Sequence, residues 1–94
     1  MSQIIGWGIL GPGSIAKSFA ADLAKVPDAA LVAVGSRSRQ RAEAFAEQFD
    51  VQRAYDDYEA LMADPDVDVI YIATPHPFHH PQTIACLEHG KAVL

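Results

Sequence analysis

The chain has 94 residues, half of them apolar, which suffices for one compact domain near the lower end of the usual size. Its formal net charge of −5 and its lack of any long basic stretch argue against a nucleic-acid surface, because clustered lysines and arginines hold phosphate backbones. A single cysteine excludes an internal disulfide, and the longest apolar stretch, residues 4–10, is far below the ~20 residues that cross a bilayer. No basic segment precedes an apolar run at the start. We therefore expect a soluble, cytoplasmic protein whose partners include neither nucleic acid nor a membrane.

The first half of the chain predicts strands that alternate with helices. Residues 4–10 are apolar at successive positions, which is typical of a strand buried on both faces of a parallel sheet. Apolar residues then recur at helical spacing over 15–26, and Pro27 ends this predicted helix. Residues 30–34 are again continuously apolar and predict a second buried strand. This strand, helix and strand form one unit of an α/β fold.

The same alternation continues in the middle of the chain. Residues 42–49 carry apolar side chains at helical spacing, and Ser38 is the expected N-cap of that helix. A short third strand is expected over 53–55, followed by a short helix over 58–62 with Asp57 as its cap. The second unit therefore repeats the first.

The last third of the chain completes the pattern. Residues 69–73 give the clearest strand pattern, and Pro81 suits the first turn of a following helix with Gly90 at its C-terminal cap. The apolar positions assigned to that helix are Ile84, Ala85 and Leu87. A fifth strand begins at Ala92 and is cut short where the sequence stops. Right-handed crossovers predict an α/β, doubly wound parallel sheet of order 3-2-1-4-5, truncated at its fifth strand.

A glycine turn between the first strand and the first helix indicates phosphate binding. Gly11 permits the tight turn, Gly13 leaves the backbone open to a pyrophosphate, and Ala16 lets the helix lie close to the sheet. The amides at the helix N-terminus would face the phosphate charge. One alternative is a P-loop using Lys17 and Ser18, although alanine stands where that motif needs glycine. The other is a tight turn that binds nothing.

The end of the second predicted strand bears on which dinucleotide binds. NAD-binding domains carry an acidic residue there, roughly 20 residues past the glycine motif, to bind the ribose 2′-hydroxyl. This chain has Ser36 and Arg37 instead, and arginine pairs with phosphate through two parallel charged hydrogen bonds. We therefore hypothesise NADP(H) over NAD(H), with Arg41 as a helper and NAD as the other cofactor considered. The alternative is a solvated helix start with arginines spread around it.

A proline-rich segment with three histidines follows the fourth predicted strand. These are His76, His79 and His80. No carboxylate or thiolate lies within the segment, and the prolines limit how the imidazoles could converge, so we expect no metal. Cys86 is expected to be a small buried residue rather than a nucleophile.

The motifs, taken together, resemble the N-terminal NAD(P)-binding Rossmann domain of the glucose-fructose oxidoreductase / inositol dehydrogenase family (Gfo/Idh/MocA). The resemblance covers nearly the whole chain, so residues 1–94 are expected to form that one domain, without the substrate domain. It is strongest toward the dihydrodiol dehydrogenase-like branch, which uses NADP. The matching segments are Gly8-Ile9-Leu10-Gly11-x-Gly13-x-Ile15-Ala16, Ser36-Arg37-Ser38, Ala73-Thr74-Pro75, His79 and Gly90-Lys91-Ala92-Val93-Leu94.

The resemblance also implies a set of cofactor contacts. The pyrophosphate would lie against Gly11, Gly13, Ser14 and Ile15. The phosphate of the adenosine ribose would meet Ser36 and Arg37, and the inner ribose and nicotinamide would lie beside Thr74, Pro75 and His79. Family members carry asparagine after the Thr-Pro pair, whereas this chain has His76, which departs from the family pattern at that candidate contact.

The function implied is that of an NAD(P)-dependent oxidoreductase acting on a sugar, polyol or related CH–OH or carbonyl substrate. In the family the strand that begins at Ala92 runs into a Glu-Lys-Pro motif, whose lysine assists proton transfer, and here the sequence stops at Leu94. We therefore nominate no catalytic residue and expect this chain to bind cofactor without turnover, the small-molecule substrate being bound only by the longer parent. The alternative is a stand-alone, non-catalytic NADP(H)-binding or sensing module. An exposed fifth strand also leads us to hypothesise self-association into a homo-oligomer.

Overall fold

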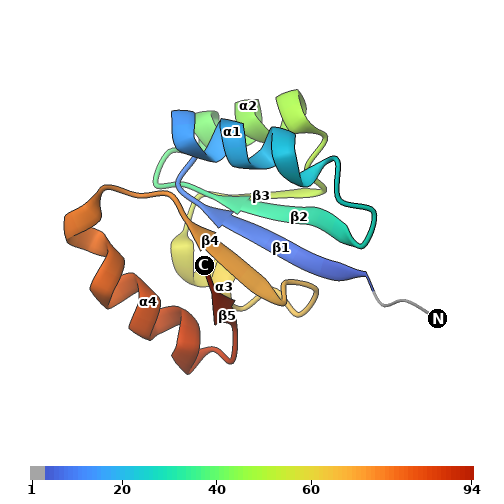
Figure 1. Cartoon of the computed structure of the whole chain (residues 1–94). Coiled ribbons are helices and arrows are strands. Elements are labelled where there is room, and N and C mark those ends of the chain that lie inside the picture. Colours follow the sequence, from blue (N-terminus) through green and yellow to red (C-terminus); the bar gives the residue numbers. More distant parts are fainter. Residues whose placement is uncertain (1–3) are drawn as a thin grey trace.

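The computed structural model describes residues 4–94, except for the side chain of His76, and shows one parallel sheet flanked by helices (Figure 1). The strands are β1 (Ile5–Leu10), β2 (Ala29–Gly35), β3 (Arg53–Tyr55), β4 (Val69–Ile72) and β5 (Ala92–Val93). The helices are α1 (Ser14–Leu23), α2 (Arg39–Phe49), α3 (Tyr58–Met62), the 3-10 turn η1 (His76–Phe78) and α4 (His79–Glu88). The strand order β3-β2-β1-β4-β5 confirms the predicted doubly wound topology. None of the helices in residues 4–94 combines the length and apolar character of a membrane span.

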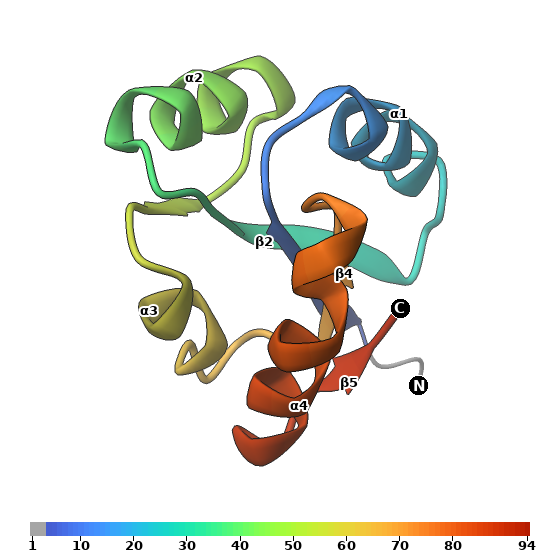
Figure 2. The ribbon, with the colours of Figure 1, turned by 90° about the vertical axis from the view of Figure 1, so that its left-hand side faces the viewer.

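Helices cover both faces of the sheet, which explains the continuous apolar runs of the central strands. Figures 1 and 2 show α1 and α2 over one face and α3 and α4 over the other (Figure 1, Figure 2). Adjacent residues of a strand point to opposite faces, so Ile9 packs with Ala16 and Phe45, while Leu10 packs in the other core. Both of these β1 side chains are fully buried. The strand therefore needs apolar residues at every position.

One helix boundary differs from the sequence predictions, whereas the last helix has Pro81 in its first turn, as predicted. Helix α1 ends at Leu23 rather than near Pro27, because the chain tightens into a turn in which the Val26 amide donates to the Leu23 carbonyl at 3.0 Å. A residue before proline also avoids the helical conformation. Val26 is accordingly exposed. Helix α4 begins at His79, two residues before Pro81.

The apolar face assigned to the last helix is wrong. Ile84 and Leu87 are exposed by 44% and 57%, whereas Cys86 is fully buried and Ala85 packs beside it. The reason is that α4 lies at the edge of the sheet, over β4 and β5, so only a narrow stripe of the helix is covered. The predicted cap is confirmed, since Gly90 adopts a left-handed φ of 78° just past the helix.

A buried carboxylate joins three separate segments at the opposite end of the sheet from the glycine turn. The side chain of Asp64 is about 1% exposed and accepts hydrogen bonds from Arg53 Nε at 2.7 Å and Tyr55 Oη at 2.8 Å. The Asp66 amide donates to the same carboxylate at 2.9 Å. Lys91 Nζ donates to the Asp64 carbonyl oxygen at 2.7 Å, which ties the start of β5 to this loop. The network thus holds three segments together: β3, β5 and the loop that precedes β4.

This network predicts a specific loss of stability in acid. Burial raises the pKa of the Asp64 carboxyl, but the hydrogen bonds it accepts, the strongest from Arg53, outweigh burial, so its pKa is lowered. A depressed folded-state pKa adds stability that is complete above the unfolded value of about 4 and is lost as the pH falls through the folded one. We expect the free energy of unfolding, measured by urea titration, to fall below about pH 4. Asp64→Asn should lower it at neutral pH and flatten this acid dependence. Asp22→Asn, at an exposed position outside the network, should leave the free energy of unfolding at neutral pH unchanged. An unchanged acid limb in Asp64→Asn would contradict the assignment.

Candidate dinucleotide-binding site

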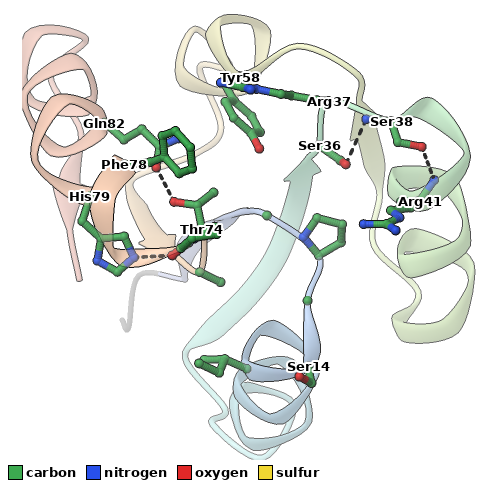
Figure 3. A pocket seen from close by; sticks show the side chains of 16 residues that line it. Ser14, Ser36, Arg37, Ser38, Arg41, Tyr58, Thr74, Phe78, His79 and Gln82 are labelled. Carbon is green, nitrogen blue, oxygen red and sulfur yellow. Dashed lines mark hydrogen bonds between the residues drawn. The ribbon is translucent and has the colours of Figure 1, made fainter.

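A cleft of about 770 Å³ opens where β1, β2 and β4 reach their carboxyl ends (Figure 3). After β1 the chain forms β2 and β3 on one side of it, and later forms β4 and β5 on the other side. The strand order therefore reverses between β1 and β4. Ligands of open α/β sheets bind at such a reversal. The volume is also within the usual range for small-molecule sites, about 300–1,000 Å³. The residues that line the cleft are Gly11, Pro12, Gly13, Ser14, Ile15, Ser36, Arg37, Ser38, Arg41, Tyr58, Ala73, Thr74, Pro75, Phe78, His79 and Gln82.

The two glycines of the turn are required for different reasons. Gly11 has a φ of +96°, and a Cβ added there would lie 2.9 Å from the Cγ2 of Thr74, so the folded backbone itself demands glycine. Gly13 has φ −80° and ψ −172°, a conformation open to any residue, and an added Cβ would meet no protein atom within 4 Å. Neither strain nor packing within the chain explains glycine at position 13. The open space beside it is therefore where a ligand can approach the backbone.

The N-terminus of α1 faces this space, and within residues 4–94 no acidic side chain caps it. Gly13 is the N-cap and supplies no side-chain hydrogen bond, and no acidic residue occurs in the first turn. The unpaired amides and the positive end of the helix dipole favour an anion there. Ala16 is fully buried against the sheet, as predicted. Ile15, placed by its spacing on the packed side of the helix, is instead 64% exposed at the cleft, because the face of the first turn lies beyond the end of β1.

Two successive side-chain hydrogen bonds shape the loop after β2. Ser36 is buried, and its Oγ accepts from the Ser38 amide at 3.1 Å. Ser38 Oγ in turn accepts from the Arg41 amide at 3.3 Å, which confirms it as the N-cap of α2. Since the Ser36 oxygen acts as acceptor in its bond, the hydroxyl hydrogen remains able to donate into the cleft.

The arginines near the start of α2 have different partners. Arg39 forms ion pairs with Asp56 at 2.9 Å and Glu43 at 3.9 Å. Arg37 and Arg41 line the cleft, and among the described residues no carboxylate lies within ion-pair distance of either. Two uncompensated guanidinium groups therefore border a cavity that also contains a helix N-terminus. This is a strongly anion-attracting arrangement.

The loop after β4 forms the opposite wall. Thr74 is buried, and its hydroxyl donates to Oε1 of Gln82 in α4. The ring of His79 donates from Nε2 to the Thr74 carbonyl oxygen, because a carbonyl can only accept (Figure 3). Pro75 lies on the exposed rim. The side chain of His76 is outside the described part of the structure.

Six lining residues were not nominated as cofactor contacts from the sequence. Three of them, Pro12, Ser38 and Ala73, adjoin nominated residues, whereas the other three, Tyr58, Phe78 and Gln82, were missed. Gln82 follows His79 by three residues, so the two share a helix face, and this spacing is the one signal that could have found it. Nothing in the sequence indicates that Tyr58, on α3, reaches the cleft.

The other chemical interpretations find little support. Lys17 lines a smaller hollow of about 310 Å³ between α1 and α2, next to the main cleft, and alanine stands at position 16 where a P-loop has glycine before its lysine. Among the residues described, no group of three or more histidine, cysteine, aspartate or glutamate side chains gathers at one point. Burial raises the pKa of the Cys86 thiol, which keeps it protonated at neutral pH and inert as a nucleophile.

The fold and the cleft define a class: a dinucleotide-binding α/β domain of the Rossmann type, with its glycine turn at the strand-order reversal. Comparison with known families agrees. Residues 5–94 match the family described as "Oxidoreductase family, NAD-binding Rossmann fold", GFO_IDH_MocA. The chain belongs to the Gfo/Idh/MocA oxidoreductase family, as its motifs predicted.

Several dihydrodiol dehydrogenases are similar to this chain over most of its length. Trans-1,2-dihydrobenzene-1,2-diol dehydrogenase of Mus musculus is 48% identical over 90 residues, covering 94% of this chain and 27% of that protein. The enzyme of the same name from Homo sapiens is 44% identical with the same coverage. The chain thus spans about a quarter of the length of these relatives.

Solved structures show the same fold. KijD10, a 3-ketoreductase from Actinomadura kijaniata in complex with TDP-benzene and NADP, superimposes with a TM-score of 0.93 at 31% identity, covering 98% of this chain and 29% of that one. Apo scyllo-inositol dehydrogenase from Lactobacillus casei superimposes with a TM-score of 0.90 at 28% identity, covering 99% of this chain and 28% of that one. The fold prediction is confirmed by both.

Proposed function

We propose that residues 1–94 form the NADP(H)-binding domain of an oxidoreductase that interconverts CH–OH and carbonyl groups in a sugar, polyol or related small molecule. The observation that carries the proposal is Gly13, which neither backbone strain nor internal packing explains and which faces an open, anion-attracting cleft. The names of the relatives support the reaction class, since they are dehydrogenases and a ketoreductase. Bound NADP in KijD10 supports the cofactor.

The proposed cofactor contacts follow the cleft from α1 to α4. The pyrophosphate lies over the amides of the glycine turn, the 2′-phosphate lies at the end of β2, and the nicotinamide end lies beside the loop after β4. The residues assigned are Gly11, Gly13, Ser14 and Ile15 for the first, Ser36, Arg37 and Arg41 for the second, and Thr74, Pro75, His76 and His79 for the third.

The cleft fits such a dinucleotide in shape and charge. Gly13 leaves room for the diphosphate, and Arg37 and Arg41 supply the positive charge that the extra phosphate of NADP requires. The nicotinamide, when bound, supplies the hydride chemistry. The chain's own residues bind and orient it, and the His79 contact to the Thr74 carbonyl holds that wall of the cleft in place. Self-association of the chain stays a prediction.

A titration that follows Trp7 fluorescence tests the proposal directly. Trp7 lies on β1, about 10 Å from the end of the strand that leads into the glycine turn. Its ring packs against that of Phe19 on α1, with the ring centroids 5.3 Å apart. Reduced nicotinamide absorbs where tryptophan emits, so binding should quench Trp7 by energy transfer. We expect saturable quenching by NADPH and at least about tenfold weaker binding of NADH, which corresponds to one phosphate contact of roughly 1.4 kcal/mol. Equal affinities would remove the NADP(H) preference, and no quenching by either would remove the site.

A further inference from the structure

The side chain of Arg37 reaches across the rim of the cleft to two aromatic rings. Its guanidinium carbon lies 5.7 Å from the ring centroid of Tyr58 and 5.7 Å from that of Phe78. Figure 3 shows the extended side chain running toward Tyr58 from the loop after β2 (Figure 3). The three residues come from that loop, from α3 and from the 3-10 turn η1. The fold therefore brings together a cation and two rings that lie far apart in the sequence.

These distances are within the range of about 6 Å at which a cation is attracted to the face of a ring. Arg39, two residues away, is held by carboxylates, whereas the described residues offer Arg37 no carboxylate at ion-pair distance. A carboxylate would neutralise the guanidinium and occupy its N–H donors. Aromatic rings attract the charge without using those donors, so the group stays ready to bind an anion.

We infer that Tyr58 and Phe78 are positioning residues for Arg37, holding its guanidinium at the rim before the cofactor binds and thereby raising the preference for the phosphorylated ribose of NADP(H) over NAD(H). The inference rests on the proposed function and deepens it. A free arginine side chain loses much rotamer freedom when it binds phosphate, and holding it in advance removes part of that loss. The rings act through Arg37 and not through a contact of their own with the 2′-phosphate.

The decisive variant is Phe78→Leu, because Phe78 is 43% exposed and its replacement leaves the buried cores untouched. We expect the dissociation constant of NADPH, measured by Trp7 quenching, to rise roughly two- to fivefold, the size expected from one exposed cation–ring contact. The dissociation constant of NADH should stay unchanged. Phe78→Tyr keeps a ring and should behave as the original chain.

Tyr58→Leu provides a second, independent test. Tyr58 also packs against the core beneath α3, so its leucine variant is to be checked by thermal unfolding before its affinities are compared. Tyr58→Phe keeps the ring and serves as its conservative control. A loss of NADPH affinity in the leucine variant that Tyr58→Phe does not share is the expected result.

A double-mutant cycle with Arg37→Met separates positioning from a direct contact. With the guanidinium removed, Phe78→Leu should change the NADPH affinity no further. Two results would overturn the inference: an equal loss of NADPH and NADH affinity in Phe78→Leu, or an effect of Phe78→Leu that is undiminished in the Arg37→Met background. Either would mean that the rings contact the adenosine directly. If the original chain itself binds NADPH and NADH equally, the NADP(H) proposal falls together with this inference. An NADPH preference that is undiminished in both Phe78→Leu and Tyr58→Leu overturns the inference alone.

Discussion

Replacing Gly13 with alanine is expected to remove most of the cofactor affinity and to leave the fold intact. The backbone at this position suits alanine, and the added methyl group meets no protein atom, so the free energy of unfolding should stay the same or rise by about 0.4–1 kcal/mol. The methyl group instead occupies the space through which a diphosphate reaches the amides of α1. We expect the dissociation constants of NADPH and NADH to rise by at least about tenfold, measured by Trp7 quenching.

Gly11→Ala is the matched comparison for stability, and unlike Gly13→Ala it should destabilise the fold. A positive φ costs an alanine about 1–2 kcal/mol, and the new Cβ would also press against Thr74 Cγ2. The urea midpoint should therefore fall clearly. A Gly13→Ala variant that binds NADPH normally, or that unfolds as readily as Gly11→Ala, would show that the open space at position 13 has no bearing on the cofactor.

Substitution of the two arginines that line the cleft is expected to affect NADPH and spare NADH. Arg37→Met and Arg41→Met each remove a guanidinium that lacks a carboxylate partner among the described residues. A charged hydrogen bond to phosphate contributes roughly 1.5–3 kcal/mol, so each variant should raise the NADPH dissociation constant by about 10- to 100-fold. The NADH constant should change by less than about twofold, since NADH lacks the 2′-phosphate.

Arg39→Met serves as the control for charge. It removes the same charge from the same segment, but its guanidinium is paired with Asp56 on the surface rather than at the cleft. NADPH affinity should therefore be retained, apart from a small loss of long-range attraction that salt screens. Should Arg39→Met weaken NADPH as much as Arg37→Met does, the effect would be one of net charge and the assigned 2′-phosphate site would be wrong.

Local patterns predicted the order of the elements well, because each pattern reflects a constraint that acts within a few residues. The run of apolar residues before Gly11 predicted a strand buried on both faces, and Ser38 and Asp57 were correctly recognised as helix caps. The same reasoning failed for Ile15 and Leu87, which are apolar residues at helical spacing that the structure exposes. Helical spacing defines a face, but only the neighbouring elements decide how much of that face is covered.

The amino-acid sequence alone was sufficient to predict the sheet order and the glycine turn, since these depend on periodicity and on small residues at set positions, and the resemblance of its motifs indicated the family. The sequence assigned Gly11 to the turn and Gly13 to the ligand, and the tertiary structure supplied the reason, because internal packing demands glycine at position 11 and leaves space at position 13. Only the tertiary structure showed that Arg39 is paired with Asp56, that Arg37 lies near the rings of Tyr58 and Phe78, and that Tyr58 reaches the cleft. The physical reason is that charge pairing and ring contacts depend on side chains that meet across the fold, and no spacing along the chain encodes which of them will meet.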